Sequence, residues 1–146
     1  GNIDRLAGRC AALQLEVDET VIPYAYTVVR GAETVLPIHG GNVTTPYAIA
    51  CPEDTFVIGI SGEASAGGLH DVTIHCAELQ ISGSPGDYSV GYGPDTTEIV
   101  DGDNTGVAYE DLLAAPAVVD RIQGRAGAWV DAIGIGPADV VVALIE

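Results

Sequence analysis

The chain has 146 residues, with 21 acidic side chains against five arginines and no lysine, which gives a formal net charge of −16. A surface this negative repels phosphate groups, so nucleic acid and the anionic face of a membrane are disfavoured as partners. The hydrophobic fraction is 47%, while no apolar run reaches the roughly 18 residues of a membrane span. The sequence therefore predicts one folded domain over residues 1–146, without membrane insertion.

Apolar and β-branched residues recur at strand spacing along the chain, and glycine, proline, asparagine and aspartate interrupt them at short intervals. The predicted strands cover residues 12–17, 24–29, 56–60, 71–75 and 138–145. One stretch, 107–119, has helix-like spacing that Pro116 limits. The pattern predicts an all-β fold with at most a turn or two of helix.

The chain also contains an internal repeat. The segment Cys10–Leu15 returns as Cys76–Ile81, and Gly67–Asp71 returns as Gly127–Asp131. We expect two repeats, at about 4–70 and 71–131, followed by a C-terminal closing strand over 138–145. Pairing the first strand with Val140–Val142 would remove two sheet edges at once; the alternative is an open edge.

Three cysteines leave at least one without a partner inside the chain. If a turn is centred near Ala64, the register of a 51–76 hairpin places Cys51 opposite Cys76, within reach of a disulfide. We therefore predict a Cys51–Cys76 bond with Cys10 free, and Cys10–Cys51 is the competing pair. A disulfide favours an oxidising compartment, and we expect a secreted or cell-surface protein.

The segment from Gly124 to Gly134 resembles the last hairpin of jacalin-like lectins. Their hallmark is Gly-x-x-x-Asp, often with an aromatic residue inside it, and Gly127, Trp129 and Asp131 match it residue by residue. The resemblance implies a β-prism of repeated antiparallel sheet units, with a β-sandwich or barrel as the alternative. Family members also carry a glycine-rich loop near the N-terminus, and Gly40-Gly41-Asn42 hints at such a loop in this chain.

The resemblance further implies a sugar site in the loop Gly127–Asp131 that needs no metal or cofactor. Gly127 would allow the tight turn, and the backbone N–H groups of Ala128 and Trp129 would donate to sugar hydroxyls. The Asp131 carboxylate would accept from two hydroxyls, and the Trp129 ring would cover the apolar side of the sugar. The structural alternative is that Trp129 fills the core and Asp131 caps the turn.

Two weaker sites complete the candidates. Gly67 and Asp71 repeat the Gly-x-x-x-Asp pattern, but Leu69 stands where the aromatic residue would be. Asp101 and Asp103 occupy the first and third positions of a turn resembling the front of a calcium loop, although the twelfth position is Leu112 rather than glutamate. The alternative for that turn is ordinary solvated backbone.

No enzyme motif is found in the sequence. His39, His70 and His75 stand in different segments, and none lies in a serine or cysteine nucleophile motif. The sequence thus predicts a non-catalytic, lectin-like protein whose partners are glycans or glycoconjugates. The alternative is a structural or adhesive surface protein that forms homo-oligomers through its sheet edges.

Overall fold

The computed structural model describes residues 3, 5–41, 49–100 and 105–143, and these residues form β-strands and no helix. All strand pairs are antiparallel, and none of the sheets closes on itself. The all-β prediction is therefore confirmed. Within the described part of the chain, no helix has the length and apolar character that crossing a membrane requires.

The largest sheet has the strand order β10-β7-β5-β11, and the short strand β6 pairs with the end of β5. Its members are β5 (Phe56–Ser65), β6 (Gly68–Leu69), β7 (Val72–Ala77), β10 (Thr96–Val100) and β11 (Val107–Leu112). The stretch 107–119, which had helix-like spacing, is therefore strand β11, a turn at Pro116 and the start of β12. Its β-branched and aromatic residues suit a strand, and pairing with β5 overrides the weak helical period.

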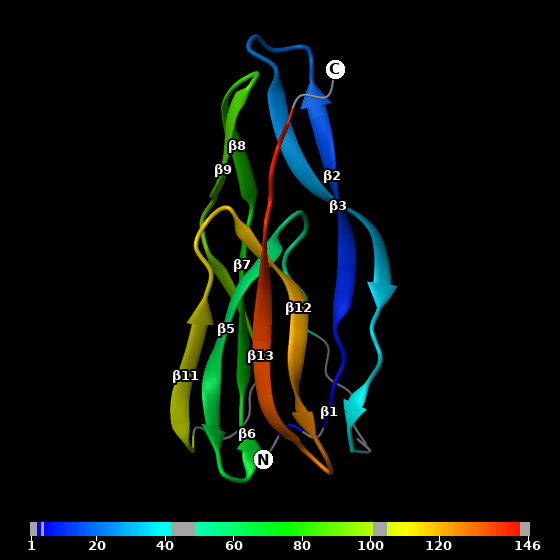
Figure 1. The fold of residues 1–146 in the computed structure, drawn as a ribbon, viewed down its shortest axis with the longest axis vertical. Helices are drawn as coiled ribbons and strands as arrows, with labels where there is room; N and C mark the ends of the chain where they lie inside the picture. Colours follow the sequence, from blue (N-terminus) through cyan, green and yellow to red (C-terminus); the bar gives the residue numbers. More distant parts are fainter. Residues whose placement is uncertain (1–2, 4, 42–48, 101–104, 144–146) are drawn as a thin grey trace.

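A second sheet has the order β2-β3-β8-β9, and two further sheets contain two strands each. The second sheet comprises β2 (Arg9–Asp18), β3 (Ala25–Val35), β8 (Leu79–Ser84) and β9 (Asp87–Tyr92). The two-stranded sheets are β12 (Ala117–Ala126) with β13 (Val130–Asp139) and β1 (Arg5–Leu6) with β4 (His39–Gly40). Figure 1 shows an elongated molecule in which the turns of the β2–β3 and β8–β9 hairpins lie at one end, opposite the end that holds β1 and β6.

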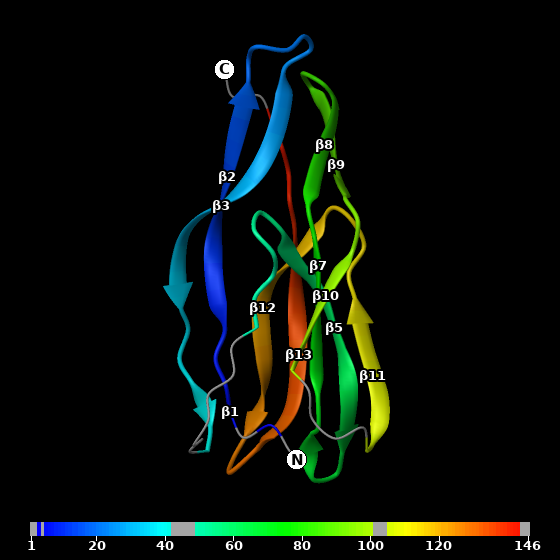
Figure 2. The same ribbon diagram turned by 180° about the vertical axis from the view of Figure 1, so that it is seen from behind.

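Two apolar clusters hold the sheets together. One cluster brings together strands of three sheets through Val28, Phe56, Leu79, Val90 and Val118. The other lies around Leu69, Val72 and Val130, with Ile3, Leu6 and Tyr109 packed against it. This second cluster supports the end of the molecule where β6 and the β12–β13 hairpin turn lie, seen from behind in Figure 2.

The predicted closure between the first strand and Val140–Val142 is wrong. The Ile3 N–H donates to the Leu69 carbonyl at 2.8 Å, and the Ile3 carbonyl accepts from the Val130 N–H at 2.9 Å. Figure 1 shows β1 near one end of the molecule, while the chain after β13 runs towards the other end. Val140 and Val142 instead pack against the first apolar cluster. Of the closing strand expected over 138–145, residues 138–139 end β13 and residues 140–143 form no strand, while 144–145 lie outside the described residues.

The Cys51–Cys76 disulfide is confirmed, and Cys10 is a free, exposed thiol. The register that suggested this bond is wrong, because Cys76 pairs with Val57 rather than with Cys51. The turn lies at residues 66–67, and Cys51 reaches β7 from the loop before β5. The two Cα atoms are 5.6 Å apart, so the loop supplies the proximity that strand pairing does not.

Candidate functional site

The loop of residues 127–129 joins β12 to β13 and exposes its aromatic side chain. The Gly127 N–H donates to the Trp129 carbonyl at 2.9 Å, which closes the turn through the backbone. Trp129 is 47% exposed, so it does not fill the core. Its ring is therefore available to a ligand on the outside of the loop.

Asp131 follows this loop as the extra residue of a β-bulge. Ala126 pairs with Val130 and Arg125 pairs with Ala132, which leaves Asp131 without a partner in the ladder. A bulge bends the strand and changes the direction of the extra side chain. Asp131 is exposed, and its carboxylate can accept hydrogen bonds from outside the protein.

Gly41 brings a distant part of the chain against the same loop. A Cβ atom added to Gly41 would lie 2.5 Å from the Ala128 carbonyl oxygen. Only glycine allows two backbones to approach so closely. Gly41, which directly follows β4, and the 127–129 loop are thus neighbours in the fold, although Asn42 lies outside the described residues.

Asp131 also borders a hollow of about 300 Å³ between β5, β11 and β13. Apolar side chains of Ile60, Leu69 and Ile133 line part of it, and Tyr109 and Asp111 add polar groups. Tyr109 is half-buried, and burial together with the nearby Asp71 charge raises its pKa to about 12. Its hydroxyl therefore stays protonated and able to donate across the neutral pH range. The sequence carried no signal for Tyr109, since only the fold brings residues of β11 and β13 to the same hollow.

The second Gly-x-x-x-Asp segment has a different environment. The Asp71 carboxylate accepts a hydrogen bond from the Glu63 backbone N–H, and its carbonyl accepts from the Tyr109 hydroxyl at 3.0 Å. The Gly67 N–H donates to the Ser65 hydroxyl at 3.1 Å. These contacts give Asp71 a role in fixing the β5–β6 turn, whereas Asp131 points outward. Ile3 lies between the two segments through its bonds to Leu69 and Val130.

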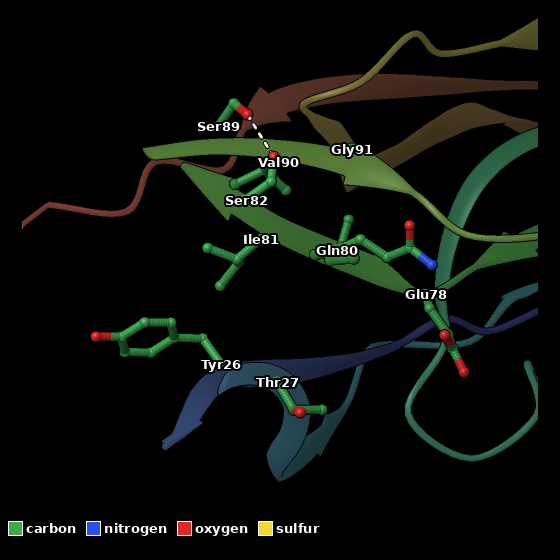
Figure 3. Close-up of a pocket in the computed structure, with 10 residues that line it drawn as sticks. Tyr26, Thr27, Glu78, Gln80, Ile81, Ser82, Ser89, Val90 and Gly91 are labelled. Atoms are coloured by element: carbon green, nitrogen blue, oxygen red, sulfur yellow. Dashed lines mark hydrogen bonds between the residues drawn. The ribbon is translucent and has the colours of Figure 1, made fainter. Parts of the chain in front are cut away.

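A larger groove of about 480 Å³ lies between β3 and β8–β9, and no predicted site residue lines it. The β3 and β8 strands pair only at Thr27 and Gln80, so their separation opens the groove. Figure 3 shows Tyr26 and Ile81 on opposite walls, with a hydrogen bond between Ser82 and Ser89. The Tyr26 hydroxyl accepts from that of Tyr88, and this bond raises the pKa of Tyr88.

No cluster of three or more histidine, cysteine or carboxylate side chains that could hold a metal ion occurs in the part of the chain that the structure describes. Asp101 and Asp103, the candidates for a calcium turn, lie outside the described residues. Comparisons of the chain with models of protein families, with curated proteins and with solved structures give no match.

Proposed function

We propose that this protein is lectin-like and binds glycans at the Gly127–Asp131 hairpin loop, and that this loop is a non-catalytic binding site. The observation that carries the proposal is the approach of Gly41 to the Ala128 carbonyl, at 2.5 Å for an added Cβ atom. It brings Gly41, directly after β4 in the N-terminal part of the chain, beside the Gly-x-x-x-Asp loop. The resemblance to jacalin-like lectins links these two features, and a β-prism is the corresponding proposal for the arrangement of the sheets.

Recognition would combine stacking with hydrogen bonding. Trp129 offers an exposed ring face for the apolar side of a sugar, and Asp131 offers a carboxylate for its hydroxyls. The hollow beside Asp131 gives room for a neighbouring hydroxymethyl group or second sugar. Because Asp111 and Asp131 border that hollow, neutral sugars suit it better than sialic or uronic acids.

The test is binding of the purified protein to an immobilised panel of neutral and sialylated oligosaccharides, followed by titration of the best neutral sugar. We expect Trp129→Ala and Asp131→Ala each to weaken that binding at least tenfold, since each removes one of the two modes of contact. Tyr24→Ala is the matched control for the aromatic change, because Tyr24 is 50% exposed. Asp120→Ala is the control for the charge, on an exposed position of β12.

Loss of binding in the two loop variants with retention in both controls would support the site. Binding that survives both loop changes would overturn it. A wild-type protein that binds no member of the panel would leave the lectin proposal without support. Circular dichroism spectra of all four variants would show that their folds are intact.

The second candidate function is a structural or adhesive protein that self-associates through a sheet edge. The observation that favours it is β2, a ten-residue strand at the end of its sheet. Leu13, Leu15 and Val17 alternate along it and are each more than 40% exposed. A strand edge of this kind can pair with the same edge of a second copy.

Multi-angle light scattering across a wide protein concentration range would test this candidate. The Cys10→Ser variant should be used, so that an intermolecular disulfide does not produce a false dimer. We expect Leu15→Lys to shift any dimer towards monomer. A monomer at all concentrations would contradict self-association. Either function fits secretion, which we propose because the Cys51–Cys76 disulfide needs an oxidising compartment to persist.

A further inference from the structure

Three strands of the largest sheet bring a serine, a histidine and an aspartate into one hydrogen-bonded chain. The Ser61 Oγ lies 2.8 Å from Nε2 of His75, and Nδ1 of the same ring lies 3.3 Å from Oδ2 of Asp95. Ser61 belongs to β5 and His75 to β7, while Asp95 directly precedes β10. The residues are 14 and 20 positions apart, so no sequence motif joins them.

The register of the sheet explains how the groups meet. His75 pairs with Gly59 on β5, and Ser61 stands two residues further along the same face. Gly59 has no side chain of its own, so the imidazole can reach diagonally across β5 to the Ser61 hydroxyl. Residues diagonally placed on neighbouring strands lie within reach of long side chains.

The chemistry of the groups at the two ends, Ser61 and Asp95, sets the direction of these hydrogen bonds. A carboxylate only accepts, so the bond to Asp95 places the ring proton on Nδ1 of His75. In the neutral ring, the Nε2 atom then accepts from the Ser61 hydroxyl. A nucleophile within hydrogen-bond reach of a base, with the base oriented by a third group, is the arrangement that activates serine.

We propose that Ser61 is an activated nucleophile that takes acyl groups from short-chain, uncharged or cationic esters, with His75 as its base. Asp95 is a positioning residue, because it acts through the His75 ring. The Ser61 Oγ bonds to the ester carbonyl carbon while its proton passes to Nε2 of His75. The ester C–O bond then breaks, and the proton moves to the departing alcohol. Water releases the carboxylic acid by the same route, with His75 taking the proton of the water.

Neighbouring side chains define the class of ester. Leu112 pairs with Gly59 from the β11 side, is 47% exposed and covers the Gly59 backbone, so it offers an apolar surface to a short acyl chain. Glu110 pairs with Ser61 on the same face. Its carboxylate would repel an anionic ester. Ser61 itself is half-buried, which limits the size of the acyl group.

The test is covalent labelling of the intact protein by a neutral fluorophosphonate, which forms a stable bond with activated serines. Intact mass and peptide mapping would report the number and position of adducts. We expect one adduct, on Ser61, and none on the Ser61→Ala variant. Ser65→Ala is the matched control, because Ser65 also lies on β5 and shares a 2.7 Å bond with a histidine, His70.

The rate of acylation is measured with p-nitrophenyl acetate. We expect Asp95→Asn to slow acylation about a hundredfold and Asp95→Glu to restore part of the rate, which a merely structural role would not do. The anionic p-nitrophenyl succinate should react more slowly than the acetate. An unlabelled protein, an adduct on other residues, or wild-type acylation no faster than that of Ser61→Ala would overturn the proposal. Retention of circular dichroism and of any sugar binding in Ser61→Ala would separate this site from the hairpin loop.

Discussion

At Gly41 the chain backbone approaches the 127–129 loop so closely that a side chain has no room. In Gly41→Ala the new Cβ atom would lie 2.5 Å from the Ala128 carbonyl oxygen, so the loop must move. We expect sugar binding to weaken about tenfold, while overpacking lowers the free energy of unfolding by about 1–3 kcal/mol. Titration with the neutral sugar and urea denaturation would measure the two effects.

Gly91→Ala is the control for this change, because an added Cβ atom at Gly91 meets nothing within 4 Å. We expect it to leave sugar binding unchanged. Unaltered affinity in Gly41→Ala would show that the position of the 127–129 loop does not matter for the ligand.

The titration of Tyr109 makes the free energy of unfolding depend on pH. Burial, and then the negative charge of Asp71, raise its pKa from 10.0 to about 12. A raised pKa means that folding favours the protonated form, so this contribution to stability is complete below pH 10.0 and declines as pH rises towards 12. We therefore expect the free energy of unfolding to fall over that interval.

The Tyr109→Phe variant tests this assignment. It loses the hydrogen bond to the Asp71 carbonyl, which costs about 1 kcal/mol at neutral pH, but it also has no hydroxyl to ionise. The alkaline decline should therefore be shallower in Tyr109→Phe than in the wild type, by urea denaturation at pH 9 and 11.5. Equal declines would assign the effect to other groups.

Asp71 and Asp131 show how the same sequence pattern acquires two roles. The carboxylate of Asp71 is held by the Glu63 backbone, while Asp131 is turned outward by a bulge. The glycine and the aspartate of both Gly-x-x-x-Asp patterns can be recognised in the sequence. Whether the carboxylate faces the protein or the solvent depends on neighbouring strands, which the pattern does not specify.

At the scale of elements, the disulfide fastens the loop before β5 to the buried C-terminal end of β7. Cys76 is completely buried, and the bond spans 25 residues. Replacing both cysteines by alanine should lower the free energy of unfolding by about 3 kcal/mol, because the unfolded chain regains the freedom of a loop of this length. Urea denaturation under non-reducing conditions would measure it.

Cys10→Ala is the control at this scale, since Cys10 is exposed and free. It should unfold like the wild type. A double variant as stable as the wild type would mean that strand pairing alone fixes the loop before β5.

The strands themselves were largely predictable, because β-branched residues and short-range alternation specify extended backbone locally. β2, β3, β5 and β7 overlap predicted strands, although most of the observed strands are longer. Their partners were not predictable to the same extent: the 51–76 register was wrong because the true turn lies at residues 66–67 rather than near Ala64. A small shift of a turn changes every cross-strand pair that follows.

At the scale of the whole molecule, the net charge of −16 acts on stability as well as on the choice of partner. Like charges on a compact chain repel each other, and salt screens them. Raising NaCl from about 10 mM to about 500 mM should increase the melting temperature by about 3 °C or more, because the screening length falls from about 30 Å to a few ångströms. Differential scanning fluorimetry measures the shift, and a melting temperature that falls with salt would contradict the explanation.

The sequence by itself determined the all-β class and the acidic character of the chain. These properties follow from composition and from patterns only a few residues long. The tertiary structure alone decided that Ile3 lies between Leu69 and Val130, and that Gly41 meets Ala128. It also decided that hydrogen bonds join Ser61, His75 and Asp95. Such contacts join strands far apart in sequence, and their pairing depends on how all the sheets pack together rather than on any local pattern.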